Sequence, residues 1–135
     1  MRDAPRIVLD TNVWLSALVF GGKPRQIVEL FAAGFISVVV SEELLTEMRR
    51  SVRRAFLDFR DNLARMEALI EHDAEMVPLG SMTIAVCRDL DDNHILETAV
   101  IGECTYIVSG DNDLLSLKQY ESICILKPDE FLRLA

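Results

Sequence analysis

The sequence has few of the residues that build disulfide scaffolds, zinc sites or membrane spans. It contains three cysteines, which form no CxxC pair, and only two histidines. These low numbers of cysteine and histidine predict buried free thiols in a reducing compartment and argue against a zinc site. The longest apolar runs, such as FISVVV, are far too short to cross a bilayer, and the first residues lack the apolar stretch of a signal peptide. We therefore expect a soluble protein of the cytoplasm with no membrane contact.

Basic residues are also scarce. The 14 Lys and Arg residues stand against 22 Asp and Glu residues, which gives a net charge of −8 at pH 7. Such a balance argues against a general nucleic-acid binder, because these proteins usually carry a basic face. The distribution is uneven, however, and one short segment gathers Arg49, Arg50, Arg53 and Arg54. At this point the segment fits a nucleic-acid contact and a solvated helix face equally well.

The chain does have the length and the apolar content of one globular domain. Half of its 135 residues are hydrophobic and 27% are charged. A chain of this size buries roughly two-thirds of its unfolded surface, which is enough for a substantial core. No internal repeat, low-complexity segment or Gly/Ser linker divides it. We expect a single domain over residues 1–135.

Hydrophobic patterning predicts strands that alternate with helices. Short β-branched runs predict strands, and apolar stripes at helical spacing predict helices. The predicted strands span residues 6–10, 35–40, 74–79, 105–109 and 122–127. The predicted helices span residues 24–34, 41–52, 58–73, 92–103, 112–117 and 128–134, with a loop over 80–90. This alternation predicts an α/β fold with a parallel sheet covered on both faces.

Carboxylates stand where sites form in such a fold, beyond the carboxyl ends of the strands. Asp10 ends the first predicted strand, and Asp111 follows the strand over residues 105–109. Asp92 begins a predicted helix, and helical spacing places it on the buried stripe of that helix. If the two strands are neighbours, these three acids share one crevice. Glu47 lies beside the apolar face of its own helix and can line the rim, although spacing alone does not place it there.

Two further acids, Asp89 and Asp91, lie just before Asp92. We expect Asp91 to be the N-cap of the helix, and Asp89 to order the preceding loop or to remain solvated. His94 and Glu97 have the i, i+3 spacing of a metal-binding pair. We nevertheless expect both side chains at the surface.

Capping or solvation explains any one of these acids better than a site does, but it explains the whole set less well. Asp is common at strand ends and helix N-termini because its side chain accepts hydrogen bonds from free backbone N–H groups. Here three separate strand-to-helix junctions each supply an Asp, and only Arg88 brings a basic residue close to any of them. Converging carboxylates repel one another, and a hard cation such as Mg²⁺ or Mn²⁺ would neutralise them.

A divalent cation held by acids points to phosphoryl chemistry. It recruits phosphates, activates water and stabilises a leaving oxygen, which is what a phosphodiester nuclease needs. Such a site requires no Ser or Cys nucleophile. The run Arg49, Arg50, Arg53 and Arg54 follows Glu47 on the same predicted helix and could hold the backbone of a single RNA strand.

Four segments follow one another along the chain: IVLDTNVWLSAL, SEELLTEMRRSV, RDLDDNHILETAV and YIVSGDNDLL. In this order they resemble the successive signatures of PIN-domain proteins, most closely the prokaryotic VapC-like toxins, and the resemblance extends over residues 6–131. It implies a three-layer α/β/α fold around a five-stranded parallel sheet. It also implies a Mg²⁺- or Mn²⁺-dependent endoribonuclease, often a homodimer, that acts on RNA and is blocked by a cognate antitoxin protein.

By position, the resemblance also implies three groups of site residues. The catalytic acids are Asp10, Glu47, Asp92 and Asp111. The metal ligands are Asp10, Asp92 and Asp111, with Asp113 as an accessory acid. The supporting polar residues are Thr11, Asn12 and Ser109. Leu90 stands where the family often has Pro, which loosens the loop geometry but leaves the acids in place.

Three other interpretations stay open. A haloacid-dehalogenase-like phosphatase also places Asp after its first strand, but it needs a second Asp two residues later, where this chain has Asn12. A phospho-receiver domain shares the acidic pocket, but the middle strand over residues 35–40 is followed by no phosphoacceptor Asp. A PIN protein with weak or absent catalysis, which binds RNA or an antitoxin, fits the same residues as the nuclease.

Overall fold

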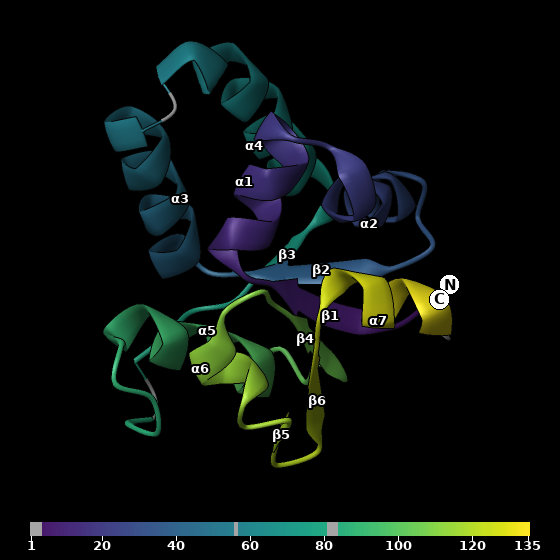
Figure 1. Ribbon diagram of the computed structural model, residues 1–135, viewed down its shortest axis with the longest axis vertical. Coiled ribbons are helices and arrows are strands. Elements are labelled where there is room, and N and C mark those ends of the chain that lie inside the picture. Colours follow the sequence, from purple (N-terminus) through teal and green to yellow (C-terminus); the bar gives the residue numbers. More distant parts are fainter. Residues whose placement is uncertain (1–3, 56, 81–83) are drawn as a thin grey trace.

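The computed structural model describes residues 4–55, 57–80 and 84–135. Its strands are β1 (Arg6–Leu9), β2 (Ser37–Val40), β3 (Glu75–Met76), β4 (Tyr106–Val108), β5 (Gln119–Tyr120) and β6 (Ile123–Leu126). Its helices are α1 (Thr11–Val19), α2 (Gly22–Ala32), α3 (Glu42–Ala55), α4 (Arg60–Asp73), α5 (Leu90–Ile101), α6 (Asn112–Leu115) and α7 (Pro128–Leu134), with a 3₁₀ turn at Leu57–Phe59. Helices lie on both sides of the sheet, so the predicted three-layer α/β/α architecture is confirmed (Figure 1).

The sheet has the strand order β3-β2-β1-β4-β6-β5. Five strands are parallel, as predicted, namely β3, β2, β1, β4 and β6. The sixth, β5, is an additional edge strand that runs antiparallel to β6. The prediction missed β5 because a strand of two residues shows no readable alternation. The chain moves from β1 to one edge of the sheet and later returns to place β4 on the other side of β1. The strand order therefore reverses between β1 and β4, which is where sites form in open α/β sheets.

Alternation along β1 divides the core between the two faces of the sheet. Ile7 and Leu9 pack into the cluster that includes side chains of α1, α2, α3, α4 and α7. Val8, which points the opposite way, packs into the cluster that includes side chains of α5 and α6. Figure 1 shows α1 to α4 on one side of the sheet and α5 and α6 on the other.

Local signals located most helix ends. Gly34 has φ +86° and follows α2, where the Phe35 N–H donates to the Leu30 carbonyl at 2.9 Å, so it ends the helix as predicted. The Ser41 hydroxyl accepts from the Leu44 N–H at 3.4 Å at the start of α3. The prediction missed α1, whose sequence TNVWLSALV is apolar on nearly every side and shows no amphipathic stripe.

Two predictions around α5 were wrong. The helix begins at Leu90, and its N-cap is Asp89, whose carboxylate accepts from the Asp91 N–H at 3.0 Å. Asp91 therefore lies in the first turn and is not the cap. The spacing of a capping box, with an acid three residues after the cap, is present from Asp89 to Asp92 and would have located this start. Glu97 is buried and not at the surface, because its carboxylate accepts from the Gly80 N–H at 2.7 Å.

The three thiols are free, as predicted, but the prediction that they are buried holds for only one of them. Cys104 is buried, whereas Cys87 and Cys124 are half-buried. Burial raises the pKa of Cys104 to about 12, so this thiol is unreactive. Within the described ranges, no helix combines the length and the apolar character that crossing a membrane requires.

Candidate metal centre

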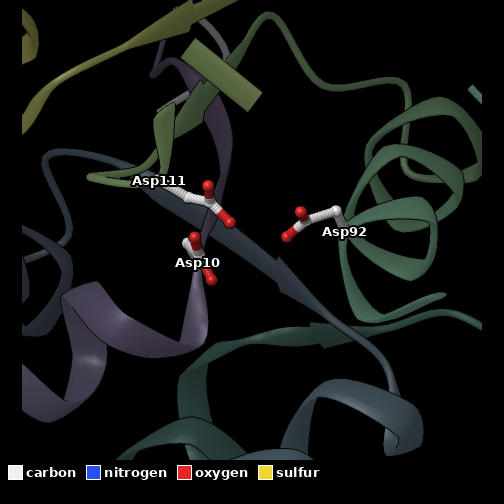
Figure 2. A group of neighbouring side chains, drawn as sticks. All are labelled: Asp10, Asp92 and Asp111. Atoms are coloured by element: carbon white, nitrogen blue, oxygen red, sulfur yellow. The ribbon is translucent and has the colours of Figure 1, made fainter. Parts of the chain in front are cut away.

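Three carboxylates meet at the carboxyl edge of the sheet. Asp10 directly follows β1, Asp111 lies in the loop between β4 and α6, and Asp92 lies in the first turn of α5. One oxygen from each side chain lies within 4.8 Å of the other two. Figure 2 shows the three side chains converging from these separate elements. The prediction that the side chains of Asp10, Asp92 and Asp111 come together is therefore confirmed.

The pairing of β1 with β4 brings Asp10 and Asp111 together. The two strands are parallel, and Leu9 lies opposite Val108, so both strands end at the same level. The Asp10 N–H donates to the Val108 carbonyl at 2.9 Å, which extends this pairing by one residue. The acids thus lie on neighbouring strand ends although 101 positions separate them in the sequence.

Ser109 connects the two strand-end acids. Its hydroxyl donates to Asp10 Oδ2 at 2.7 Å and accepts from the Asp111 N–H at 2.9 Å. Ser109 is fully buried, so this hydrogen bond holds one carboxylate in a fixed orientation and also positions the backbone of the other. The Asp111 carboxylate in turn accepts from the Asp113 N–H at 2.9 Å, which caps α6. These contacts leave the remaining carboxylate oxygens for a ligand.

Burial and mutual repulsion make the ionised form of this cluster costly. Asp10 and Asp92 are only 3% and 4% exposed. Burial raises the pKa of Asp92 to about 7, with a further contribution from the facing Asp111. Burial also raises the pKa of Asp10, against the opposing hydrogen bond from Ser109. At neutral pH the cluster therefore needs either protons or a cation.

Glu47 on α3 lies close enough to the converging aspartates for the charge of Asp10 to act on its carboxylate. Burial raises its pKa to about 7, and the negative charges of Asp91 and Asp10 add to this effect. Its oxygens lie outside the set that converges within 4.8 Å. The predicted fourth acid thus borders the site formed by Asp10, Asp92 and Asp111 without touching it.

The donor set fits a hard divalent cation. Three buried side-chain oxygens in the described residues have no hydrogen-bond partner, namely Thr11 Oγ1, Glu47 Oε2 and Asp92 Oδ2. Buried polar atoms of this kind are rare and need an explanation. Within the described part of the chain, no Lys or Arg forms an ion pair with the three converging aspartates. Carboxylate and hydroxyl oxygens without basic partners are what Mg²⁺ and Mn²⁺ prefer.

Two of the other predicted site residues, Asp113 and Asn12, are not in the group of acidic side chains whose oxygens converge within 4.8 Å. The Asp113 carboxylate pairs with Arg88, whose Nη2 lies 3.1 Å and 3.2 Å from its two oxygens. Asn12 is exposed at the start of α1, although its backbone N–H and that of Thr11 favour the charged form of Asp10. The pairing of Arg88 was missed because it joins residues 25 positions apart.

The four arginines on α3 do not share one environment. Arg49 Nε donates to Glu67 Oε2 on α4 at 3.0 Å, so this side chain joins two helices. Arg50, Arg53 and Arg54 are exposed, and none of them forms an ion pair with a described residue. The predicted RNA-binding run therefore divides into one structural arginine and three that are open to solvent.

Comparison with known proteins assigns the family. The sequence profile of the PIN domain matches residues 6–113 of this chain. The chain belongs to the PIN-domain family. PIN domains are generally nucleases, and the match covers all three converging aspartates. This assignment sets aside the phosphatase and phospho-receiver interpretations.

Two similar proteins extend this finding. The uncharacterized protein MJ1680 of Methanocaldococcus jannaschii is 31% identical over 117 residues, which cover 84% of this chain and 75% of that protein. The crystal structure of VapBC2 from Rickettsia felis, bound to a DNA fragment from their promoter, matches with a TM-score of 0.60. That match covers 89% of this PIN domain and 96% of the other chain, and at 14% identity it supports the fold alone.

Proposed function

We propose that this PIN protein is an endoribonuclease that depends on Mg²⁺ or Mn²⁺ held by Asp10, Asp92 and Asp111. The observation that carries the proposal is the convergence of three carboxylates, two of them buried, without a basic partner. When bound, the cation would supply a Lewis acid for the scissile phosphate and an activated water. The Asp113 carboxylate would bind the metal as an accessory ligand only after it released Arg88.

The surrounding residues have distinct roles in this proposal. Ser109 fixes Asp10 through its 2.7 Å hydrogen bond and so keeps the metal ligands oriented. Glu47, with a pKa of about 7, can hold or release a proton at Oε2 near neutral pH. The Thr11 hydroxyl has no partner among described residues and can donate to an oxygen in the site. Asn12, exposed at the rim, is available to the substrate.

Cleavage of RNA by the variants Asp10→Asn and Asp92→Asn tests this function. The wild-type protein should cut RNA with Mn²⁺ and leave it intact in EDTA. Each variant should lose about 100-fold or more in rate, because even the residues that orient metal ligands contribute about 10- to 100-fold. Glu103→Gln, which removes an exposed carboxylate, is the matched control and should keep full activity.

Three outcomes would contradict parts of the proposal. Undiminished cleavage in both Asn variants would reject the metal centre. Equal cleavage of DNA of the same sequence would reject the preference for RNA. Binding of RNA with metal but without cleavage would favour the interpretation in which catalysis is weak or absent.

We also propose that the protein is the cytoplasmic toxin of a toxin–antitoxin pair and forms a homodimer. The likeness to VapBC2 of Rickettsia felis motivates this proposal. A groove of about 350 Å³ supports it, because Leu18, Val28 and Met66 supply apolar contact while Arg25 and Arg65 supply charge for an acidic partner segment.

Expression of the wild-type protein alone should arrest growth, and co-expression of the neighbouring gene should relieve the arrest. Growth equal to that with Asp92→Asn would contradict a toxin, and a monomer by light scattering would contradict the dimer.

A further inference from the structure

The exposed arginines of α3 lie at different angles to the site. With about 100° per residue around a helix, Arg54 lies about 20° and Arg50 about 60° from the direction of Glu47. By the same measure Arg53 lies about 120° away. Glu47 points toward the acidic residues around the site, since the charges of Asp91 and Asp10 act on its carboxylate. Arg50 and Arg54 therefore lie on the side of α3 that carries Glu47, one and two turns further along the helix, whereas Arg53 points away from that side.

A separate observation supports the position of Arg50. Its positive charge lowers the pKa of Glu47, in opposition to the surrounding acids. The guanidinium is thus close enough to act on the crevice electrostatically. It still forms no ion pair with a described residue, so it is available to an anionic ligand.

A third cation approaches from the other layer of the fold. Arg88 precedes α5, and its side chain is 88% exposed. Its guanidinium contacts both oxygens of Asp113, which lies on α6 only two residues after Asp111. In Figure 1, α3 lies on one side of the sheet and α5 and α6 lie on the other. The arginines therefore flank the converging aspartates from both layers.

The net negative charge of the protein makes these three arginines important for binding RNA. A chain with a net charge of −8 repels RNA as a whole, and the acid crevice repels a phosphate most strongly. Exposed cations close to the three aspartates weaken this repulsion locally. Exposed ion pairs contribute little to stability, so Arg88 can exchange Asp113 for a phosphate at small cost.

We propose that a single RNA strand passes over Asp10, Asp92 and Asp111 from α3 to α6, with phosphates held by Arg50 and Arg54 on one side of the scissile bond and by Arg88 on the other. This proposal rests on the endoribonuclease function. It assigns substrate binding to Arg88, and it separates Arg50 and Arg54 from Arg49 and Arg53.

The salt dependence of RNA binding tests the path. The probe is a short fluorescein-labelled single-stranded RNA of mixed sequence, measured by anisotropy in EDTA, where the RNA stays intact. Each phosphate contact contributes about 0.7 to the slope of log Kd against log salt for a single strand. Arg50→Ala, Arg54→Ala and Arg88→Ala should each lower the slope by about this amount. Arg53→Ala removes the same charge from an exposed position on the same helix and should leave the slope unchanged.

The outcomes separate this path from the function on which it rests. An equal drop in slope for Arg53→Ala would overturn the path, because it would show diffuse attraction to the helix. Unchanged slopes for the three path variants, or no measurable binding at low salt, would overturn it as well. Cleavage of RNA by the wild-type protein with Mn²⁺ is measured independently. If cleavage occurs while the slopes stay unchanged, only the path fails.

Discussion

Both ends of the sheet gather acidic residues, but only one end has the properties of a site. At the carboxyl end, Asp10 and Asp92 are buried, and Asp92 has an oxygen without a partner. At the amino end, Glu103 and Glu121 line a surface hollow of about 510 Å³, and both are exposed. Water solvates the glutamates and screens their charges, whereas the aspartates have lost most of their water and face one another.

The comparison teaches that acidity by itself does not indicate a metal centre. Two exposed carboxylates on separate turns have little need of a cation. Converging buried carboxylates have a large electrostatic cost, which protons or a metal must offset. Matched substitutions at the two ends of the sheet should therefore give different results.

The largest expected difference is in metal affinity. Asp111→Asn removes one of three converging ligands, so its Mn²⁺ affinity should fall about 100-fold or more. Glu121→Gln removes one carboxylate from the amino end and should leave the affinity unchanged. Isothermal titration calorimetry measures both variants. Equal losses would show that Mn²⁺ binds through general charge and not at the carboxyl end.

The next difference concerns stability without metal. The pKa of Asp92 is raised to about 7 in the folded protein, from 3.8 when unperturbed. Between these values the folded state binds more protons than the unfolded state, so this group makes the protein less stable as pH rises from about 4 to about 7. In EDTA at pH 8, Asp92→Asn should therefore be more stable than wild type by about 1–3 kcal/mol.

Urea unfolding across the pH range measures this effect. The advantage of Asp92→Asn should vanish below about pH 3, where the wild-type carboxyl is protonated in both states. Glu103→Gln should stay within about 0.5 kcal/mol of wild type at every pH, as expected for a surface change. An advantage of Asp92→Asn that is independent of pH would show that it does not come from ionisation.

A smaller effect is expected from the hydroxyl that orients the acids. Ser109→Ala removes the donor to Asp10 Oδ2 and the acceptor of the Asp111 N–H. Mn²⁺ affinity should fall about 10-fold, because the ligands remain but lose their fixed orientation. Ser122→Ala at the amino end is the control and should bind Mn²⁺ as wild type does. An unchanged affinity for Ser109→Ala would mean that packing alone positions the carboxylates.

The smallest effect belongs to the amino end itself. Glu121 has φ +53°, in the left-handed region that favours glycine. Glu121→Gly should relieve this strain and stabilise the protein by about 0.5–1 kcal/mol, seen as a rise in Tm of about 2–4 °C. Ser122→Gly next to it gains no such relief and should lower Tm. A lower Tm for Glu121→Gly would show that its side chain contributes more than its backbone costs.

Local rules predicted most of the site. Asp10 and Asp111 were recognised because acids at the carboxyl ends of parallel strands share an edge, and Asp92 because helical spacing directs it inward. The same rules failed for Glu97, whose burial depends on the Gly80 N–H from a distant loop. They also failed for α1, because a helix enclosed by other elements has no polar face to reveal its period.

The sequence by itself determined the alternation of strands and helices and the position of an Asp at three junctions, because propensity, capping and hydrophobic period act between near neighbours. Tertiary structure decided which acids converge and which arginines stay free. Arg49 pairs with a residue 18 positions away and Arg88 with one 25 positions away, while Arg50 and Arg54 form no ion pair with a described residue. Such pairings depend on how whole layers pack, and no local pattern in the chain records that geometry.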